Sequence, residues 1–64
     1  MNRMSMKALR IDRGLTQAEF ASALNVTKKT VSSWESGKTH PKVDKIEAIC
    51  EVLSVPYDDI RWNV

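Results

Sequence analysis

Residues that end α-helices recur along this chain after every short run of helical spacing, and they constrain its fold more than any other feature. They are Gly14, Asn25, the segment Gly37 to Pro41 and the segment Ser54 to Pro56. Glycine and asparagine tolerate the left-handed backbone that follows a helix, and proline cannot continue one. Between these positions the apolar residues recur at helical spacing, and no stretch alternates as a strand would. We therefore expect an all-α fold without strands.

Five helices are expected between these positions, three of them in the first half of the chain. The first covers residues 5–13. The second begins with a capping box, in which Thr16 and Glu19 each satisfy a backbone amide at the helix start. The third is capped by Thr27 and extends to about Ser36. Helices this short depend on packing against the rest of the chain.

The remaining two helices complete a compact five-helix bundle. The fourth carries apolar residues spaced by three and four on one face, namely Val43, Ile46, Ile49, Cys50 and Leu53. A short fifth helix follows Pro56, with Ile60 facing inward. A chain of 64 residues is expected to form one domain over residues 1–64, with a core over about 5–60 and a short tail over 61–64.

Few residues of the chain are suited to catalysis or to metal binding. Cys50 is the only cysteine and His40 the only histidine, so a metal site lacks ligands and no disulfide forms within the chain. Cys50 lies in the apolar pattern and is expected to be a buried thiol. A nucleophile needs a base and an orienting group, and His40 lies in an expected loop beside Pro41. We expect no enzyme, no cofactor and no metal.

No run of about 20 apolar residues is present, so no membrane span is expected. The first six residues are too short and polar a stretch for a signal peptide, which favours a cytoplasmic protein. The net charge is +2 over residues 1–25, +3 over residues 26–45 and −3 over residues 46–64. A basic part followed by an acidic part is typical of an oriented polyanion binder, but charges that merely keep a small domain in solution explain it equally well.

The second and third expected helices are joined by three or four residues around Asn25, which is the spacing of a helix-turn-helix. A set of residues at fixed spacing accompanies this turn: Gly14 to Ala21, Leu24 to Thr27, Val31, Ser32, Trp34 to Gly37, Pro41, Ile46, Ile49, Leu53, Val55 and Ile60. Through these residues the chain resembles the Cro/phage-repressor (XRE-like) helix-turn-helix family over roughly residues 6–60. It departs from the family pattern at Asn25 (usually glycine), Phe20 (usually leucine) and Pro56 (often serine).

The resemblance implies a lambda-repressor-like DNA-binding domain whose third helix lies in the major groove. It implies base contacts from the exposed side of that helix, at Thr27, Lys28, Lys29, Ser32 and Ser33. The chemistry agrees, because lysine donates to the O6 and N7 acceptors of guanine and serine serves donor or acceptor edges. The alternative is that Lys28 and Lys29 form a solvated helix face or touch only phosphate.

The resemblance also implies contacts to the DNA backbone. The residues concerned are Gln17, Thr30, Lys38, Thr39, His40 and Lys42. Gln17 begins the second helix, where backbone amides attract phosphate. Ordinary polarity at a helix start or in a solvated loop is the alternative.

Two further roles follow from the family pattern. Arg10 of the first helix and Glu35 of the third are expected to pair and to hold the third helix against the first, unless both are independent surface charges. Tyr57, Trp62 and Val64 form a candidate dimer interface, because many relatives dimerise through this end. The alternative is that Trp62 folds back and covers the small core.

These features predict a sequence-specific regulator of transcription that binds double-stranded DNA, either a phage-type repressor or a Cro-like switch protein that occupies an operator. A homodimer on a pseudo-palindromic site is expected, in the cytoplasm of a bacterium and encoded by it or by a phage. One alternative is the antitoxin or autoregulator of a small operon. Another is a protein-interaction module that does not bind DNA, although the basic third helix argues against it.

Overall fold

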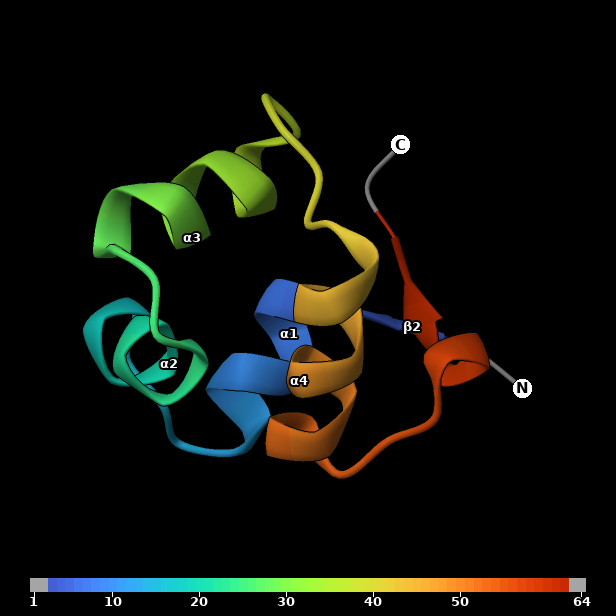
Figure 1. Ribbon diagram of the computed structural model, residues 1–64. Coiled ribbons are helices and arrows are strands. Elements are labelled where there is room, and N and C mark those ends of the chain that lie inside the picture. Colours follow the sequence, from blue (N-terminus) through green and yellow to red (C-terminus); the bar gives the residue numbers. More distant parts are fainter. Residues whose placement is uncertain (1–2, 63–64) are drawn as a thin grey trace.

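The computed structural model describes residues 3–62, which form a small helical domain (Figure 1). Its elements are β1 (Met4–Ser5), α1 (Met6–Asp12), α2 (Gln17–Leu24), α3 (Lys28–Ser36), α4 (Val43–Leu53), the 3-10 turn η1 (Tyr57–Asp59) and β2 (Ile60–Arg61). The first four helices lie where the sequence predicts them. The expected helix-turn-helix is formed by α2 and α3.

The helices begin and end at residues whose local chemistry requires it. The capping box at the start of α2 is present, because the amide of Glu19 donates to Thr16 Oγ1 at 3.0 Å and the amide of Thr16 donates to Glu19 Oε1 at 2.9 Å. Asn25 ends α2 with a φ of 59°, and Gly37 ends α3 with a φ of 83°. The predictions for these caps are confirmed.

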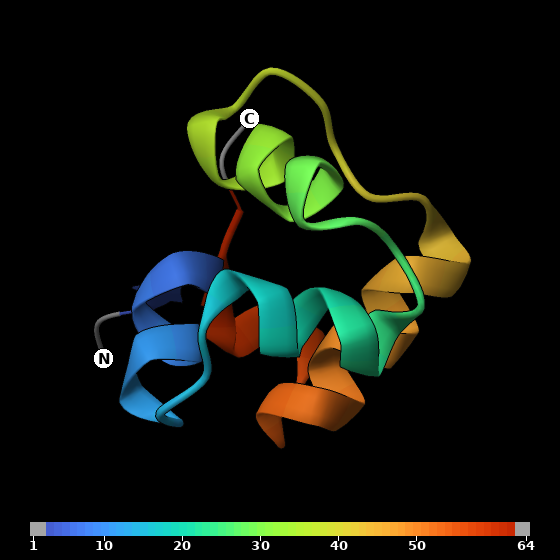
Figure 2. The same cartoon turned by 90° about the vertical axis from the view of Figure 1, so that its left-hand side faces the viewer.

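One apolar core joins all four helices. Its buried residues are Met6, Leu9, Phe20, Ala21, Leu24, Val31, Trp34, Ile49, Leu53 and Ile60. In both views α3 lies above the other three helices, and it packs mainly on α2 (Figures 1 and 2). Because α3 is attached to the core through one side only, its opposite side faces solvent.

The expectation of a fold without strands is wrong. β1 and β2 pair in parallel, with Met4 opposite Ile60 and Ser5 opposite Arg61. Each strand has only two residues, which is too short to show an alternating pattern in the sequence. The pairing joins the two ends of the described chain and depends on the helices that bring them together.

The expected five-helix count is also wrong, because four α-helices are present among residues 3–62. The segment after Pro56 forms the single 3-10 turn η1. It stops at Ile60, whose backbone is extended (φ −101°, ψ 129°) and pairs with β1. A helix that continued through Ile60 would remove that pairing, and Ile60 is fully buried as it stands.

The expected apolar face of α4 is only partly buried. Ile49 and Leu53 are completely buried. Cys50 is half-buried and packs against the core, so its expected burial is only partial. Val43 is 73% exposed, so the prediction that it is a core residue is wrong. The apolar stripe of α4 is wider than the surface that its neighbours cover.

Candidate nucleic-acid interface

The outer side of α3 collects most of the residues predicted to contact bases. Thr27, Lys28, Lys29 and Ser32 are exposed, and Val31 and Trp34 point the other way into the core. Ser33 is half-buried, so it lies at the edge of this surface. Helical spacing places Ser32 one turn beyond Lys28 and Lys29 on the same side. This exposed side of α3, formed by Thr27, Lys28, Lys29 and Ser32, is called the α3 surface below.

Two threonines order the first turn of α3. Thr27 Oγ1 accepts a hydrogen bond from the Thr30 amide at 3.2 Å, and the two hydroxyl oxygens lie 2.9 Å apart. Thr30 is half-buried and its hydroxyl is engaged with Thr27. The first turn is therefore ordered before anything binds to it, which lowers the conformational entropy lost on binding.

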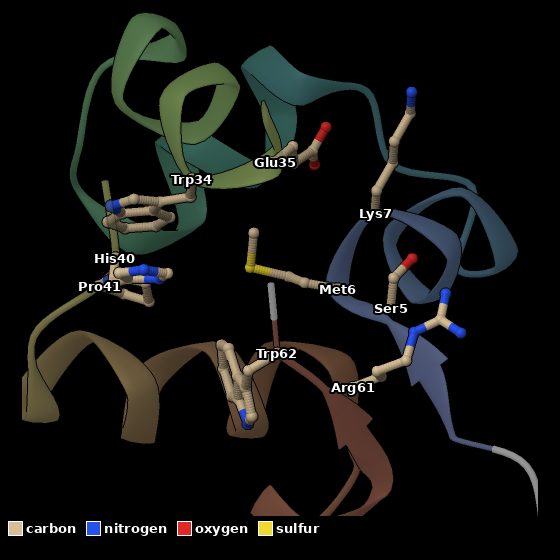
Figure 3. A pocket seen from close by; sticks show the side chains of 9 residues that line it. All are labelled: Ser5, Met6, Lys7, Trp34, Glu35, His40, Pro41, Arg61 and Trp62. Carbon is tan, nitrogen blue, oxygen red and sulfur yellow. The ribbon is translucent and has the colours of Figure 1, made fainter. Parts of the chain in front are cut away.

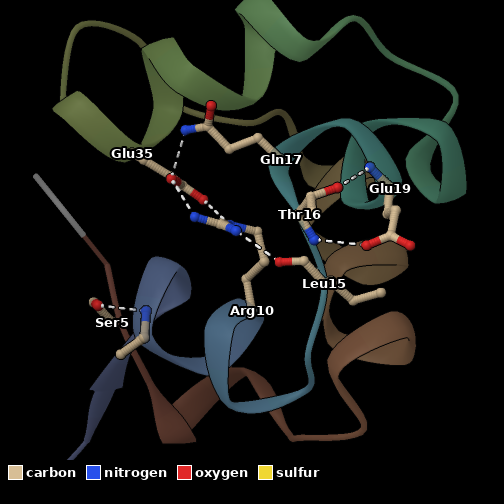
Figure 4. A network of polar contacts seen from close by, with 8 residues as sticks. Ser5, Arg10, Leu15, Thr16, Gln17, Glu19 and Glu35 are labelled. Atoms are coloured by element: carbon tan, nitrogen blue, oxygen red, sulfur yellow. Dashed lines mark hydrogen bonds and ion pairs between the residues drawn. The ribbon is translucent and has the colours of Figure 1, made fainter.

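A buried polar network fixes α3 relative to α1 and α2 (Figure 4). Arg10 Nε donates to Glu35 Oε2 at 2.7 Å and Arg10 Nη2 donates to Glu35 Oε1 at 3.3 Å. Arg10 Nη1 also donates to the Leu15 carbonyl at 2.7 Å. The two charged side chains are only 8% and 4% exposed. A buried ion pair with further hydrogen bonds contributes to orientation more dependably than to net stability.

Gln17 joins the same network. Its Nε2 atom donates to Glu35 Oε1 at 3.0 Å, so one carboxylate binds side chains of both α1 and α2 (Figure 4). The sequence suggested a phosphate contact for Gln17 and no contact with Glu35. The position of Gln17 at the start of α2 was the only signal, and it does not reveal a partner 18 residues away.

Lys45 holds the other end of α2, a role that no sequence signal indicated. Its Nζ atom donates to the Leu24 carbonyl at 2.9 Å, immediately before the turn between α2 and α3. A cation at the C-terminus of a helix satisfies a carbonyl that has no partner within the helix. Hydrogen bonds thus hold both ends of α2 in place. Gln17 binds Glu35 at the N-terminal end, and Lys45 binds the Leu24 carbonyl at the C-terminal end.

The loop between α3 and α4 exposes the remaining predicted phosphate contacts. Lys38, Thr39, His40 and Lys42 are all exposed. The amides of Lys38 and Thr39 both donate to the Ser33 carbonyl, at 3.0 and 3.4 Å, which ties the loop to the end of α3. The start of the loop is therefore held at the C-terminal half of α3, and its side chains are not part of the α3 surface.

Lys42 occupies the N-cap position of α4 and makes no side-chain capping bond. Serine, threonine, aspartate and asparagine are preferred there, because they accept a bond from the first amides of the helix. A lysine leaves those amides without that acceptor and adds a cation near the positive end of the helix dipole. The same arrangement of amides and a cation stabilises an anion.

A pocket of about 340 Å³ lies beside the end of α3 (Figure 3). Trp34, His40 and Pro41 line one side of it, and Met6 and Trp62 lie opposite. The pocket therefore separates the loop after α3 from the two ends of the described chain.

Trp62 packs against the core and stacks on Tyr57, with ring centroids 5.4 Å apart. Its Nε1 atom is buried and has no hydrogen-bond partner among residues 3–62. Trp62 thus covers part of the core, which is the alternative to a dimer contact that the sequence analysis left open. Tyr57 is 54% exposed, and Val64, the third residue of the candidate dimer interface, lies outside the described residues.

Within residues 3–62, no group of three or more His, Cys, Asp or Glu side chains is placed to hold a metal ion. No helix of this part of the chain has the length and apolar character needed to cross a membrane.

A short helix that meets a basic, outward-facing helix across a tight turn defines the class of helix-turn-helix domains. The chain belongs to the helix-turn-helix family, whose family model matches residues 6–60. The resemblance seen in the sequence is thereby confirmed.

Three curated relatives align with most of this chain. The transcriptional activator BcrR of Enterococcus faecalis is 34% identical over 86% of the chain and 27% of its own length. The antitoxin PezA of Streptococcus pneumoniae is 34% identical over 88% of the chain and 35% of its own length. The cryptic phage CTXphi transcriptional repressor RstR of Vibrio cholerae is 31% identical over 86% of the chain and 50% of its own length. The chain thus spans between about a quarter and a half of these relatives.

Proposed function

We propose that this protein binds specific sequences of double-stranded DNA through the α3 surface and regulates transcription by occupying an operator. One observation carries the proposal. Lys28, Lys29 and Ser32 project from α3 on the side away from the core, and the helix that carries them is held by a buried network. A helix in the major groove reads base edges with side chains of these types.

Backbone contacts would place the α3 surface in the groove. We assign them to Gln17, Thr30, Lys38, Thr39, His40 and Lys42. Lys38 and Lys42 supply exposed charge in the loop between α3 and α4, and the N-termini of α2 and α4 supply backbone amides. Such contacts fix the register of a protein on the duplex without reading sequence.

Arg10 and Glu35 serve this function indirectly. Their ion pair joins α1 to α3 at 2.7 Å, and Gln17 extends it to α2. Base contacts need a reading helix whose position is fixed before binding, because a loosely held side chain loses entropy when it binds. We assign the pair the role of orienting the α3 surface.

The regulatory role is a repressor of the phage type, which acts as a homodimer on DNA. The relatives include proteins named transcriptional activator, antitoxin and transcriptional repressor, which supports regulation in a bacterial or phage system and therefore in the cytoplasm. A pseudo-palindromic site with half-sites about one helical turn apart would match two copies related by a two-fold axis. Exposed Tyr57, together with Trp62 and Val64, is the proposed contact between copies.

The test is a selection of bound sequences from a random duplex library. We expect one enriched motif with two-fold symmetry, lost in the Lys28→Ala/Lys29→Ala variant. Arg3→Ala/Lys7→Ala is the matched control for loss of two charges, because both residues are exposed and belong to neither proposed interface. The logarithm of affinity should fall with the logarithm of salt concentration, by about 0.9 for each neutralised phosphate.

The same experiment distinguishes a DNA-binding regulator from a protein-interaction module that does not bind DNA. An absence of enrichment and of duplex binding at low salt would refute the proposal. Enrichment of a motif without two-fold symmetry would retain DNA binding and refute the dimer.

A further inference from the structure

The outward side of α4 forms an apolar groove that the α3 surface does not use. Val43 is 73% exposed, Tyr57 of η1 is 54% exposed, and Ile46 and Cys50 are half-buried between them. Together with Glu47 and Glu51 these residues line an open groove of about 600 Å³. This set of six residues is called the α4 groove below. Exposed large apolar side chains gathered in one place are typical of an interaction surface.

One edge of the α4 groove is acidic. Asp44, Glu47 and Glu51 follow one another at spacings of three and four, which places them on one edge of α4. All three are exposed. Within residues 3–62 the ion pairs are those of Arg10 with Glu35 and of Arg13 with Asp12, so the carboxylates of this edge are unpaired. An apolar strip beside unpaired carboxylates fits a partner that is both apolar and basic.

A second copy of this chain does not fit the acidic α4 side of this groove, although Tyr57 at its η1 side also belongs to the proposed contact between copies. Two-fold pairing through the α4 groove would place the same surface of both copies face to face. With the two α4 helices antiparallel, the carboxylates of Glu47 and Glu51 would meet their own equivalents, and in either orientation both acidic edges would lie at one interface. Like charges opposed at an interface disfavour association. DNA is excluded from the groove by the same charge.

We propose that the α4 groove binds an amphipathic helix of a partner protein, with apolar side chains along the groove and lysine or arginine along the acidic edge. The 11 residues of α4 span about 16 Å, which matches a segment of two to three helical turns. Helices bind such grooves through apolar residues spaced by three, four and seven. The α4 groove shares no residue with the α3 surface or with the proposed phosphate contacts, so the two proposed binding surfaces are distinct.

The test uses the full 64-residue chain and a displayed library of helical peptides. Each peptide carries leucine at helical spacing, with the other positions drawn from alanine, glutamine, lysine and glutamate. We expect the enriched peptides to favour lysine over glutamate on one flank. With a synthetic peptide of the enriched sequence, Val43→Asp should weaken binding about tenfold or more. The matched control is Ile11→Asp, because Ile11 is a 57% exposed apolar residue on α1 and its substitution should leave peptide binding unchanged.

Two further measurements locate the peptide and its charge preference. The Glu47→Lys/Glu51→Lys variant should reverse the preference and enrich glutamate peptides. Bound peptide should also slow alkylation of Cys50, which is the only cysteine and lies within the α4 groove. Circular dichroism of each variant shows whether its fold is retained.

Three results would overturn the proposal. The first is that no peptide is enriched, or that the enriched peptides show no preference for lysine. The second is that the Val43→Asp and Ile11→Asp variants bind the peptide equally well. The third is that the free chain associates with itself and that Val43→Asp abolishes this association. The last result would assign the groove to a second copy. All measurements are made without DNA, so their outcome is independent of whether the α3 surface binds a duplex.

Discussion

Replacing Lys42 with serine should stabilise the fold and weaken DNA binding at the same time. Lys42 has the extended backbone of an N-cap residue (φ −78°, ψ 165°), which serine adopts without rearrangement. A serine there accepts a bond from an amide in the first turn of α4, which contributes about 1 kcal/mol. Removal of the cation from the positive helix end adds about 0.3 kcal/mol to this stabilisation. In a domain of this size, about 1 kcal/mol raises the melting temperature by roughly 4–8 °C.

The effect on DNA binding has the opposite sign. If Lys42 neutralises one phosphate, its loss should reduce the magnitude of the log–log salt slope by about 0.9. Every DNA sequence should be affected alike, because a phosphate contact carries no base information. Thermal unfolding measures the first effect, and fluorescence anisotropy of a labelled duplex at several salt concentrations measures the second.

Lys38→Ser is the matched control for this experiment. Lys38 is exposed in the same loop and does not cap a helix, so the variant loses the same charge and gains no cap. Its stability should stay within about 0.5 kcal/mol of the parent while its salt slope also flattens. The reasoning fails if Lys42→Ser leaves the melting temperature unchanged, since the first amides of α4 would then need no acceptor. It also fails if affinity and salt slope do not change.

Three other predictions concern side chains within the site and the core. Arg10→Ala and Glu35→Ala should each cost about 3 kcal/mol or more in urea unfolding, because each removes the opposite charge next to a buried charged side chain, and the double variant should cost less than the sum. Strictly additive costs would show that the pair is not coupled. Lys29→Ala should alter preference at one or two base pairs by about 1–3 kcal/mol in competition with single-base variants of the site, whereas uniform weakening would indicate phosphate contact only. Burial raises the pKa of the Cys50 thiol, so at about pH 8 it should be alkylated more slowly than in the urea-unfolded chain, and equal rates would contradict that burial.

The helix boundaries were predictable because they depend on residues close together in the sequence. Thr16 and Glu19 satisfy each other's amides across one turn, and Asn25 and Gly37 adopt the left-handed backbone that ends a helix. Side-chain periodicity likewise predicted which side of α3 faces outward, since Val31 and Trp34 define its buried side.

The contacts that hold the candidate interface in place were harder to predict. The pairing of Arg10 with Glu35 was expected only from the family pattern. The bonds from Gln17 to Glu35 and from Lys45 to the Leu24 carbonyl join residues 18 and 21 positions apart. Each depends on how two helices pack, and neither leaves a spacing or composition signal.

The sequence by itself determined where α1, α2, α3 and α4 start and stop and which residues are apolar enough to form a core. Only the tertiary structure decided which of those apolar residues are covered. Val43 lies three residues before Ile46 in the same apolar pattern, yet it is exposed because no element among residues 3–62 packs over it. The pairing of Met4 with Ile60 is likewise a property of the assembled fold. Periodicity assigns a residue to a face of its own helix, and burial depends on whether another part of the chain reaches that face.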